Sequence, residues 1–258
     1  YSDRFGSPYS GYGLIMPRVT VGIRDYDGWR SGLIRVGAKW LPLDFWRVDI
    51  EAGNDIVENL DSIDNRVKLN YVSGNVDHAF APRWNAGGGL FLGKFDDGNR
   101  RTRLTGRIEY IALFKPRLSF GLEGLAFRDR EQAFRDVTLR FDNVTVAGAP
   151  ALPNVGSITF REAGRGYYNP KNYGEAKLFG AVSYDRDRWS LWAKLAVGGV
   201  RETPFDGDSS NGFISAAELA YVYHLTPQTA LRASLGRSGS RVSSSEGGGY
   251  YRNFGGIY

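Results

Sequence analysis

The side chains of this sequence that could carry out acid–base or nucleophilic chemistry are few and stand apart. Each of the two histidines, His78 and His224, begins a proline-containing stretch that we expect to form a short turn. A Ser/His nucleophilic site needs an orienting polar group at the same level, and no predicted strand supplies a serine there. Asp49 and Glu51 would share one face of a strand, but the neighbouring Arg47 favours an ion pair over acid–base catalysis. We therefore predict no catalytic residues and no enzymatic activity.

The sequence also lacks the patterns that bind metals, phosphates or nucleic acids. It contains no cysteine, which excludes disulfides and thiolate metal sites, and it has no phosphate loop, zinc spacing or EF-hand. The acidic pairs Asp96–Asp97 and Asp206/Asp208 could hold Ca²⁺, but we interpret them as solvent-facing loop residues. The formal net charge is +5, yet the basic residues recur at every second position and do not cluster. We predict no metal, no cofactor and no nucleic-acid partner.

The charged residues are positioned by strands, and the clearest case is the stretch 173–200. Ala176, Leu178 and Val182 alternate with polar residues, the segment 185–188 is a polar turn, and the alternation then resumes from Trp189. Successive side chains of a strand point to opposite faces. The pattern therefore predicts a hairpin of two long strands, each with one apolar and one mixed face.

The same alternation of apolar and polar residues, interrupted by turns, repeats along the chain and predicts about 12 antiparallel strands. Every second connection is short, and the intervening ones are mostly longer and more polar. Alternating short turns and long loops, with both termini on the short-turn side, are typical of a transmembrane up-and-down β-barrel. We expect one barrel domain over 1–258, with an irregular segment 1–13, a long extracellular loop 128–172, and a hairpin within that loop at 136–146. The alternative is a soluble β-sandwich or barrel that buries the apolar face.

Composition agrees with a membrane barrel without requiring one. The hydrophobic content is 42%, the mean hydropathy is −0.35, and the chain holds 34 Gly, 15 Tyr, 15 Phe and 6 Trp. No apolar run approaches the roughly 20 residues of a spanning helix. Half of each barrel strand is polar, so low hydropathy is expected of such a barrel.

If the apolar face meets lipid, the opposite face lines a lumen. The charges could form ion pairs that fill a narrow lumen, or a cationic channel wall for polar solutes. The predicted lumen-lining residues are Arg18, Arg24, Arg35, Lys39, Arg47, Asp49, Glu51, Arg66, Lys68, Arg103, Arg107, Glu109, Glu123, Glu175, Lys177, Lys194, Glu218 and Arg232.

A second group of candidate residues consists of tyrosines near the predicted outer mouth. Flat aromatic rings beside asparagines are suited to stacking on sugars, although tyrosines of a membrane interface belt would have the same pattern. The group comprises Tyr167, Tyr168, Tyr173, Tyr250 and Tyr251.

The motif GRGYYNPKNY, the alternating strands after it and the ending GGGYYRNFGGIY resemble the C-terminal barrels of exopolysaccharide export porins, the family of cellulose, poly-N-acetylglucosamine and Pel secretion channels. The resemblance covers roughly the last 95 residues, and no helical repeat like that family's periplasmic tetratricopeptide domain is seen. It implies passive export of a polysaccharide through the outer membrane of a Gram-negative bacterium, with the bilayer, a polysaccharide and proteins of a secretion complex as partners. The alternative from another class is a scaffolding barrel with a filled lumen that binds partner proteins.

Overall fold

The computed structural model describes residues 13–26, 29–56, 63, 66–141, 156–163, 167–226, 229–239 and 252–257. This part of the chain consists of strands joined by turns and loops. The strands are β1 (Leu14–Tyr26), β2 (Trp29–Leu41), β3 (Trp46–Ile56), β4 (Lys68–Ala81), β5 (Trp84–Phe95), β6 (Arg100–Phe114), β7 (Arg117–Asp129), β8 (Phe134–Phe141), β9 (Gly156–Ala163), β10 (Asn172–Arg186), β11 (Trp189–Thr203), β12 (Ser210–His224), β13 (Ala230–Ser238) and β14 (Arg252–Ile257).

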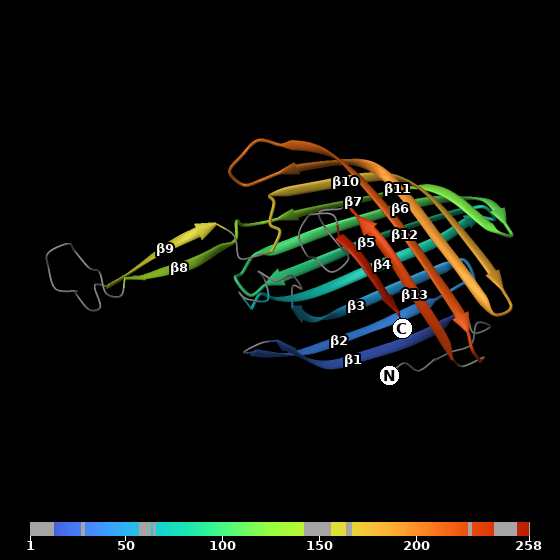
Figure 1. Ribbon diagram of the computed structural model, residues 1–258, viewed down its shortest axis with the longest axis horizontal. Helices are drawn as coiled ribbons and strands as arrows, with labels where there is room; N and C mark the ends of the chain where they lie inside the picture. The colour runs from blue at the N-terminus through green and yellow to red at the C-terminus, as the bar shows by residue number, and fades with distance from the viewer. Residues whose placement is uncertain are drawn as a thin grey trace.

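Twelve of these strands form one antiparallel sheet in which each strand lies beside its neighbours in the chain. The order is β1-β2-β3-β4-β5-β6-β7-β10-β11-β12-β13-β14, and the only departure from chain order is the step from β7 to β10. The sheet curls strongly, so that its last strands pass in front of its first (Figure 1). The predicted all-β, up-and-down architecture of about 12 strands is confirmed. Among the described residues no pairing joins β14 to β1, so the barrel is not seen to close through hydrogen bonds.

The hairpin predicted over 173–200 forms with the expected register. β10 and β11 pair along their whole lengths, and Leu178 lies opposite Val197 while Lys177 lies opposite Gly198. The two-residue connection 187–188 falls within the predicted polar turn. Directly paired residues point to the same side of a sheet, so the apolar and polar faces of the two strands coincide.

The connections at one end of the sheet are all short, as the sequence predicted, while those at the other end are mostly longer, the exceptions being 27–28 and 96–99. One end, called the turn end below, carries the short connections 42–45, 82–83, 115–116, 187–188 and 225–229; the opposite end is called the loop end. β1 starts opposite Leu41, beside the first short turn, and β14 ends at Ile257 opposite Ala233, near the last. The first and last strands of the sheet therefore begin and end at the turn end.

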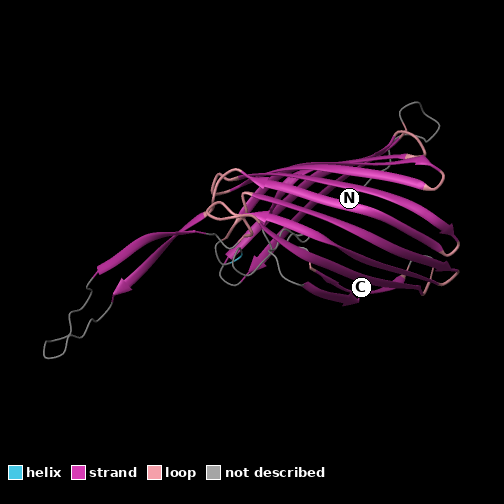
Figure 2. Cartoon of the chain, turned by 90° about the horizontal axis from the view of Figure 1, so that it is seen from above, coloured by secondary structure: helices cyan, strands magenta, loops and turns pink. Residues whose placement is uncertain are grey.

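The loop between β7 and β10 contains a hairpin, but not the one predicted at 136–146. β8 pairs with β9 in a separate two-stranded sheet, with Phe134 opposite Ala163. The second strand of this hairpin is therefore 156–163, which lies further along the chain than the alternation of residues in 136–146 indicated. This hairpin projects away from the main sheet (Figure 2).

The outer face of the main sheet is apolar and open. Ile23 is 78% exposed, Leu195 68% and Leu178 65%, and the same face carries exposed side chains on the other long strands. Aromatic rings gather on this face near the turn end, where Trp46 stacks on His78 at 3.9 Å. Tyr184 and Trp189 meet in the same belt, with 5.4 Å between their ring centroids. The described chain holds no helix with the length and apolar character needed to cross a bilayer.

Candidate functional site on the inner face of the sheet

The inner face is recognised by contacts between strands that are two places apart. Arg18 on β1 reaches over β2 to β3, where its guanidinium donates to Asp49 at 2.8 Å and to Glu51 at 2.8 Å. Gly37 of β2 lies beneath this contact, and a Cβ there would stand 2.6 Å from the Ile50 carbonyl oxygen. Only the concave side of a curled sheet brings such side chains together, so these charges face inward.

The Arg18 network continues along β2, β3 and β4. The Tyr71 hydroxyl donates to Glu51 at 2.6 Å, which satisfies a further oxygen of that carboxylate. Asp55 pairs with Arg35 and, at 3.1 Å, with Arg24. Each carboxylate of this cluster therefore has an arginine partner, as a half-buried charge requires.

A second network lies on β7, β10 and β11. Glu123 accepts from Lys194 at 2.5 Å and lies 3.6 Å from Lys177. Lys177 also donates to the buried Glu175 at 2.7 Å, and the Tyr173 hydroxyl donates to Glu175 at 2.6 Å. Three adjacent strands are thus cross-linked on their inner face by a continuous chain of charges.

A third group surrounds Glu109 of β6, which is only 5% exposed. Its Oε2 lies 2.8 Å from Arg107 and 3.2 Å from Arg117. The Arg107 guanidinium and the Lys194 ammonium both lie over the ring of Phe179, at 5.0 and 4.9 Å from its centroid. Cation–π contacts of this kind fix the direction of both cations.

The remaining predicted residues are placed by register. Lys39 lies opposite Asp49, Arg47 opposite Asp77, and Glu218 opposite Lys194. Two more join the inner face: Arg103 over the Phe91 ring at 4.4 Å, and Arg232 opposite Val222.

Lys68 and Arg66 correct the predicted facing. Alternation predicted Val67, Leu69 and Tyr71 on the lipid face, but Val67 and Leu69 are 0% and 4% exposed within an inner apolar cluster. Lys68 is therefore on the outer face of β4, and Arg66 lies before the strand begins. The apolar pattern changes face along β4, because aromatic and aliphatic side chains fill the inner side near the loop end.

The outer-mouth tyrosines that the structure describes are mostly packed inside the protein. Tyr167 is 5% exposed and stacks on Phe95 at 4.2 Å, and Tyr173 is 3% exposed and stacks on Phe127 at 5.1 Å. Tyr168 packs edge-on against Phe127 at 6.0 Å. Ring faces occupied by protein cannot also stack on a sugar, which corrects the prediction for these residues. Tyr250 and Tyr251 lie outside the described residues.

The most buried charges were not in the predicted set. Arg101 and Asp129 form a bidentate ion pair, with both distances 2.7 Å and side-chain exposures of 1% and 0%. Asn169 also donates to Asp129 at 2.9 Å, and Arg101 donates to the Tyr168 carbonyl oxygen. The pair thereby attaches the segment that follows β9 to the inner wall. Arg101 is two residues before Arg103, and residues two apart on a strand point to the same face, so the sequence could have placed Arg101 on the inner face. Its pairing with Asp129 could not be predicted from the sequence.

Tyr167 strengthens this attachment at the loop end. Its hydroxyl donates to Asp97 at 2.8 Å and accepts from Asn99 at 3.1 Å. Burial raises the pKa of Tyr167 above its ordinary value, so the phenol stays neutral at physiological pH. The inner face at the loop end is thus filled by aromatic and hydrogen-bonded side chains along this wall.

Two inner pockets lie between these networks and the turn end. One, of about 530 Å³, is lined by residues of β3 to β7 and β10, among them Arg47, Asp77 and Arg107. The other, of about 300 Å³, lies nearer the turn end and is lined by Arg107, Trp192 and Lys194, among others. Over the described residues, no group of His, Cys, Asp or Glu has the arrangement of a metal site.

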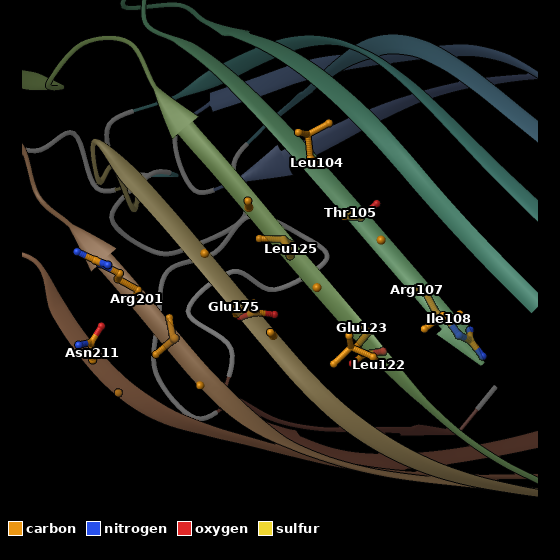
Figure 3. Close-up of a pocket in the computed structure, with 18 residues that line it drawn as sticks. Leu104, Thr105, Arg107, Ile108, Leu122, Glu123, Leu125, Glu175, Arg201 and Asn211 are labelled. Atoms are coloured by element: carbon orange, nitrogen blue, oxygen red, sulfur yellow. The ribbon is translucent and has the colours of Figure 1, made fainter. Parts of the chain in front are cut away.

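A larger apolar groove crosses the outer face and is distinct from the inner pockets. Its floor follows a row of paired small residues, Gly106, Gly124, Ala176 and Gly199. Its volume is about 1010 Å³, and Leu104, Ile108 and Leu122 lie along it (Figure 3). The groove follows from small side chains on an otherwise bulky apolar face.

Comparisons with known proteins point to a fold and not to a family. No model of a known protein family matches the sequence, and no curated protein matches it. Among solved structures, the chain is similar to a bacterial polysaccharide outer membrane secretin, with a TM-score of 0.64. The superposition covers 95% of this chain and 79% of that one, at 11% sequence identity. At this identity the likeness shows a shared fold alone, which is a curled antiparallel sheet.

Proposed function

We propose that the chain is an outer-membrane β-barrel that provides a passive, non-enzymatic path for the export of a polysaccharide or another polar solute. The observation that carries the proposal is the separation of the two faces. The outer face exposes long apolar side chains, and the inner face holds a continuous set of paired charges with room between them. A channel wall requires this orientation, because lipid contacts the outside and solute the inside.

The apolar outer face supports a location in a bilayer. Val21 is 74% exposed and Phe213 69%, and comparable side chains recur across the sheet. Contiguous apolar surface of this extent is rare on soluble monomers. The aromatic belt near the turn end fits one membrane–water interface. The structural likeness to a polysaccharide outer membrane secretin supports the outer membrane of a Gram-negative bacterium in particular.

The inner face supports conduction of a polar solute. Its charges are held in networks such as Arg18–Asp49 and Lys194–Glu123, which leave pockets of about 530 and 300 Å³ between them. A barrel of this size lies between those filled by side chains and wide porins, so a narrow path is geometrically allowed. The absence of catalytic activity remains part of this proposal.

Single-channel recording in planar lipid bilayers tests the proposal. We expect stepwise currents from the full chain, and a similar conductance when the β8–β9 hairpin, which projects away from the sheet, is replaced by a short Gly/Ser linker. A matched control replaces outer-face Leu195 by Ile, which should leave the current unchanged. Silence from both the full chain and the hairpin-deleted variant would exclude a conducting path.

A scaffolding barrel with a filled lumen is the second candidate. It is favoured by the cluster at the loop end, where Phe95, Phe127 and Tyr167 surround the Arg101 guanidinium at 4.5 to 5.9 Å. If the lumen is blocked by this cluster, neither variant will conduct. Retention of specific partner proteins after solubilisation in detergent would then support the scaffold.

A further inference from the structure

The smaller inner pocket lies close to the turn end of the sheet. Arg117 opens β7 directly after the two-residue turn 115–116. On β10 and β11, Ser183 lies opposite Trp192, three residues from the end of each strand. These residues, with Arg107 and Lys194, line a cavity of about 300 Å³, which is at the lower limit of small-ligand sites. In the proposed membrane orientation, this pocket faces the periplasmic entrance.

The pocket carries more positive than negative charge. Its lining holds the cations Arg107, Arg117 and Lys194 and the carboxylate Glu109. Lys194 is paired with Glu123, which lies outside the pocket, and both arginines share Glu109. One positive charge is therefore not neutralised within this group. The two arginine side chains are 49% and 45% exposed, so their remaining N–H donors are accessible from the lumen.

The pocket also offers a flat apolar surface. The Phe179 ring is 4% exposed and lies against Arg107 and Lys194, so it is not available to a ligand. Trp192 is only half-buried, and within the described chain no side-chain hydrogen bond or ring contact involves it. The tryptophans of the belt, including Trp189 on the same strand, lie on the outer face. An indole on the inner face beside two arginines is thus an exception to the facing of this residue type.

We propose that this pocket is a saccharide subsite that selects sugar units carrying a carboxylate. This inference rests on the proposed function and names its substrate class as an acidic polysaccharide. The planar guanidinium of Arg107 or Arg117 can bind a carboxylate through two parallel hydrogen bonds. Trp192 can pack its apolar face against the C–H face of a pyranose ring. The Ser183 hydroxyl can donate to or accept from sugar hydroxyls.

The position of the pocket suits stepwise passage. Arg107 lines both this pocket and the larger inner pocket. An acidic sugar unit that leaves the smaller pocket can therefore contact the same arginine when it enters the larger one. Lys177 and Arg47 line the larger pocket further along. Several adjacent sites of moderate affinity permit transport, because each is strong enough to capture a unit and weak enough to release it.

Isothermal titration calorimetry on the full chain in detergent tests the subsite directly. The probes are oligogalacturonate, a maltooligosaccharide of the same length, and a cationic chitosan oligosaccharide. We expect oligogalacturonate to bind at least tenfold more tightly than either of the others. Arg107→Gln and Arg117→Gln should each weaken its binding about tenfold, the usual effect of losing a charged hydrogen bond. Trp192→Leu should weaken both oligogalacturonate and maltooligosaccharide.

Matched controls separate the site from the fold. Arg201→Gln and Trp189→Leu change the same residue types on the outer face of β11 and should bind oligogalacturonate like the wild type. Arg107→Lys keeps the charge and should recover part of the affinity lost in Arg107→Gln. Heat-modifiable migration on gels confirms that each variant is folded.

The result that overturns the subsite is equal binding of acidic and neutral probes, or unchanged affinity in folded Arg107→Gln, Arg117→Gln and Trp192→Leu. Bilayer currents that oligogalacturonate and maltooligosaccharide block equally would also overturn it, while leaving the proposed conduit intact. Selective binding by a protein that never conducts has the opposite meaning: the subsite stands and the conduit fails.

Discussion

Replacing Leu178 by arginine tests whether the outer face contacts lipid, because the loss of folding stability caused by a basic residue on a lipid-facing surface depends on its depth in the bilayer. Leu178 is 65% exposed and lies six residues from Asn172 at the loop end of β10. At a rise of about 3.3 Å per residue this is roughly 20 Å along the strand, or about 14 Å along the membrane normal for a tilt near 45°. An apolar band about 25 Å tall would have its midplane close to that position.

We expect Leu178→Arg to destabilise the folded barrel by about 2–4 kcal/mol, the range for a basic residue at the midplane. In water the same change at an exposed position costs within about 0.5 kcal/mol. Ile23→Arg is the shallow control. Ile23 is 78% exposed but lies only three residues from the loop end of β1 at Tyr26, about 7 Å along the normal by the same geometry. Its cost should be lower than that of Leu178→Arg, between the midplane value and the about 0–1 kcal/mol expected at the interface.

The measurement is reversible urea unfolding in lipid vesicles, followed by tryptophan fluorescence. With a slope of about 1–3 kcal/mol per M, a loss of about 3 kcal/mol lowers the midpoint by at least about 1 M. The reasoning is refuted if Leu178→Arg and Ile23→Arg cost the same, since their exposures are similar and only depth should separate them. It is refuted equally by a wild-type chain that stays folded and monodisperse in buffer without detergent or lipid.

Three further predictions concern the inner face. Lys177→Leu should lower stability by about 1–3 kcal/mol in the same unfolding assay, because it leaves the buried Glu175 without its cation; a cost near zero would contradict the ion pair. Arg101→Ala should cost about 3–5 kcal/mol, because Asp129 would remain buried and unpaired, and the double change with Asp129→Ala should recover part of this loss. Attachment of the loop segment at Tyr167 should be complete below pH about 10 and weaken as the pH rises above it. The detached phenol ionises near that pH, whereas burial raises the pKa of the attached one. Limited proteolysis of the loop segment at increasing pH measures its detachment. A Tyr167→Phe variant should lose this pH dependence.

The alternation of residue types was sufficient to predict the sheet. Leu178 and Val197 share the outer face as their spacing indicated, and every connection at the turn end is short. The reason is physical, because a strand has a side-chain period of two and an antiparallel neighbour needs only a short turn. Strand number and connection lengths are local quantities, so one sequence is enough to obtain them.

The same period was insufficient where the apolar residues change from one face of a strand to the other. On β4, Leu69 and Tyr71 face inward near the loop end, while Val72 and Val76 face outward further along. Local alternation therefore assigned Lys68 to the wrong face. The hairpin in the long loop was misplaced because β8 pairs with 156–163, and local alternation does not show which distant segment a strand will pair with.

The sequence by itself determined that this chain alternates apolar and polar residues in long antiparallel strands, and hence that one face is apolar and the other charged. Only the tertiary structure decided which charges meet. Arg18 finds Asp49, and Lys194 finds Glu123, because curvature brings together strands that are two places apart. The tertiary structure also decided that Tyr167 is buried and that Trp192 is half-buried in the lining of a charged pocket. Partners and burial depend on the curvature of the whole sheet, and no local period encodes it.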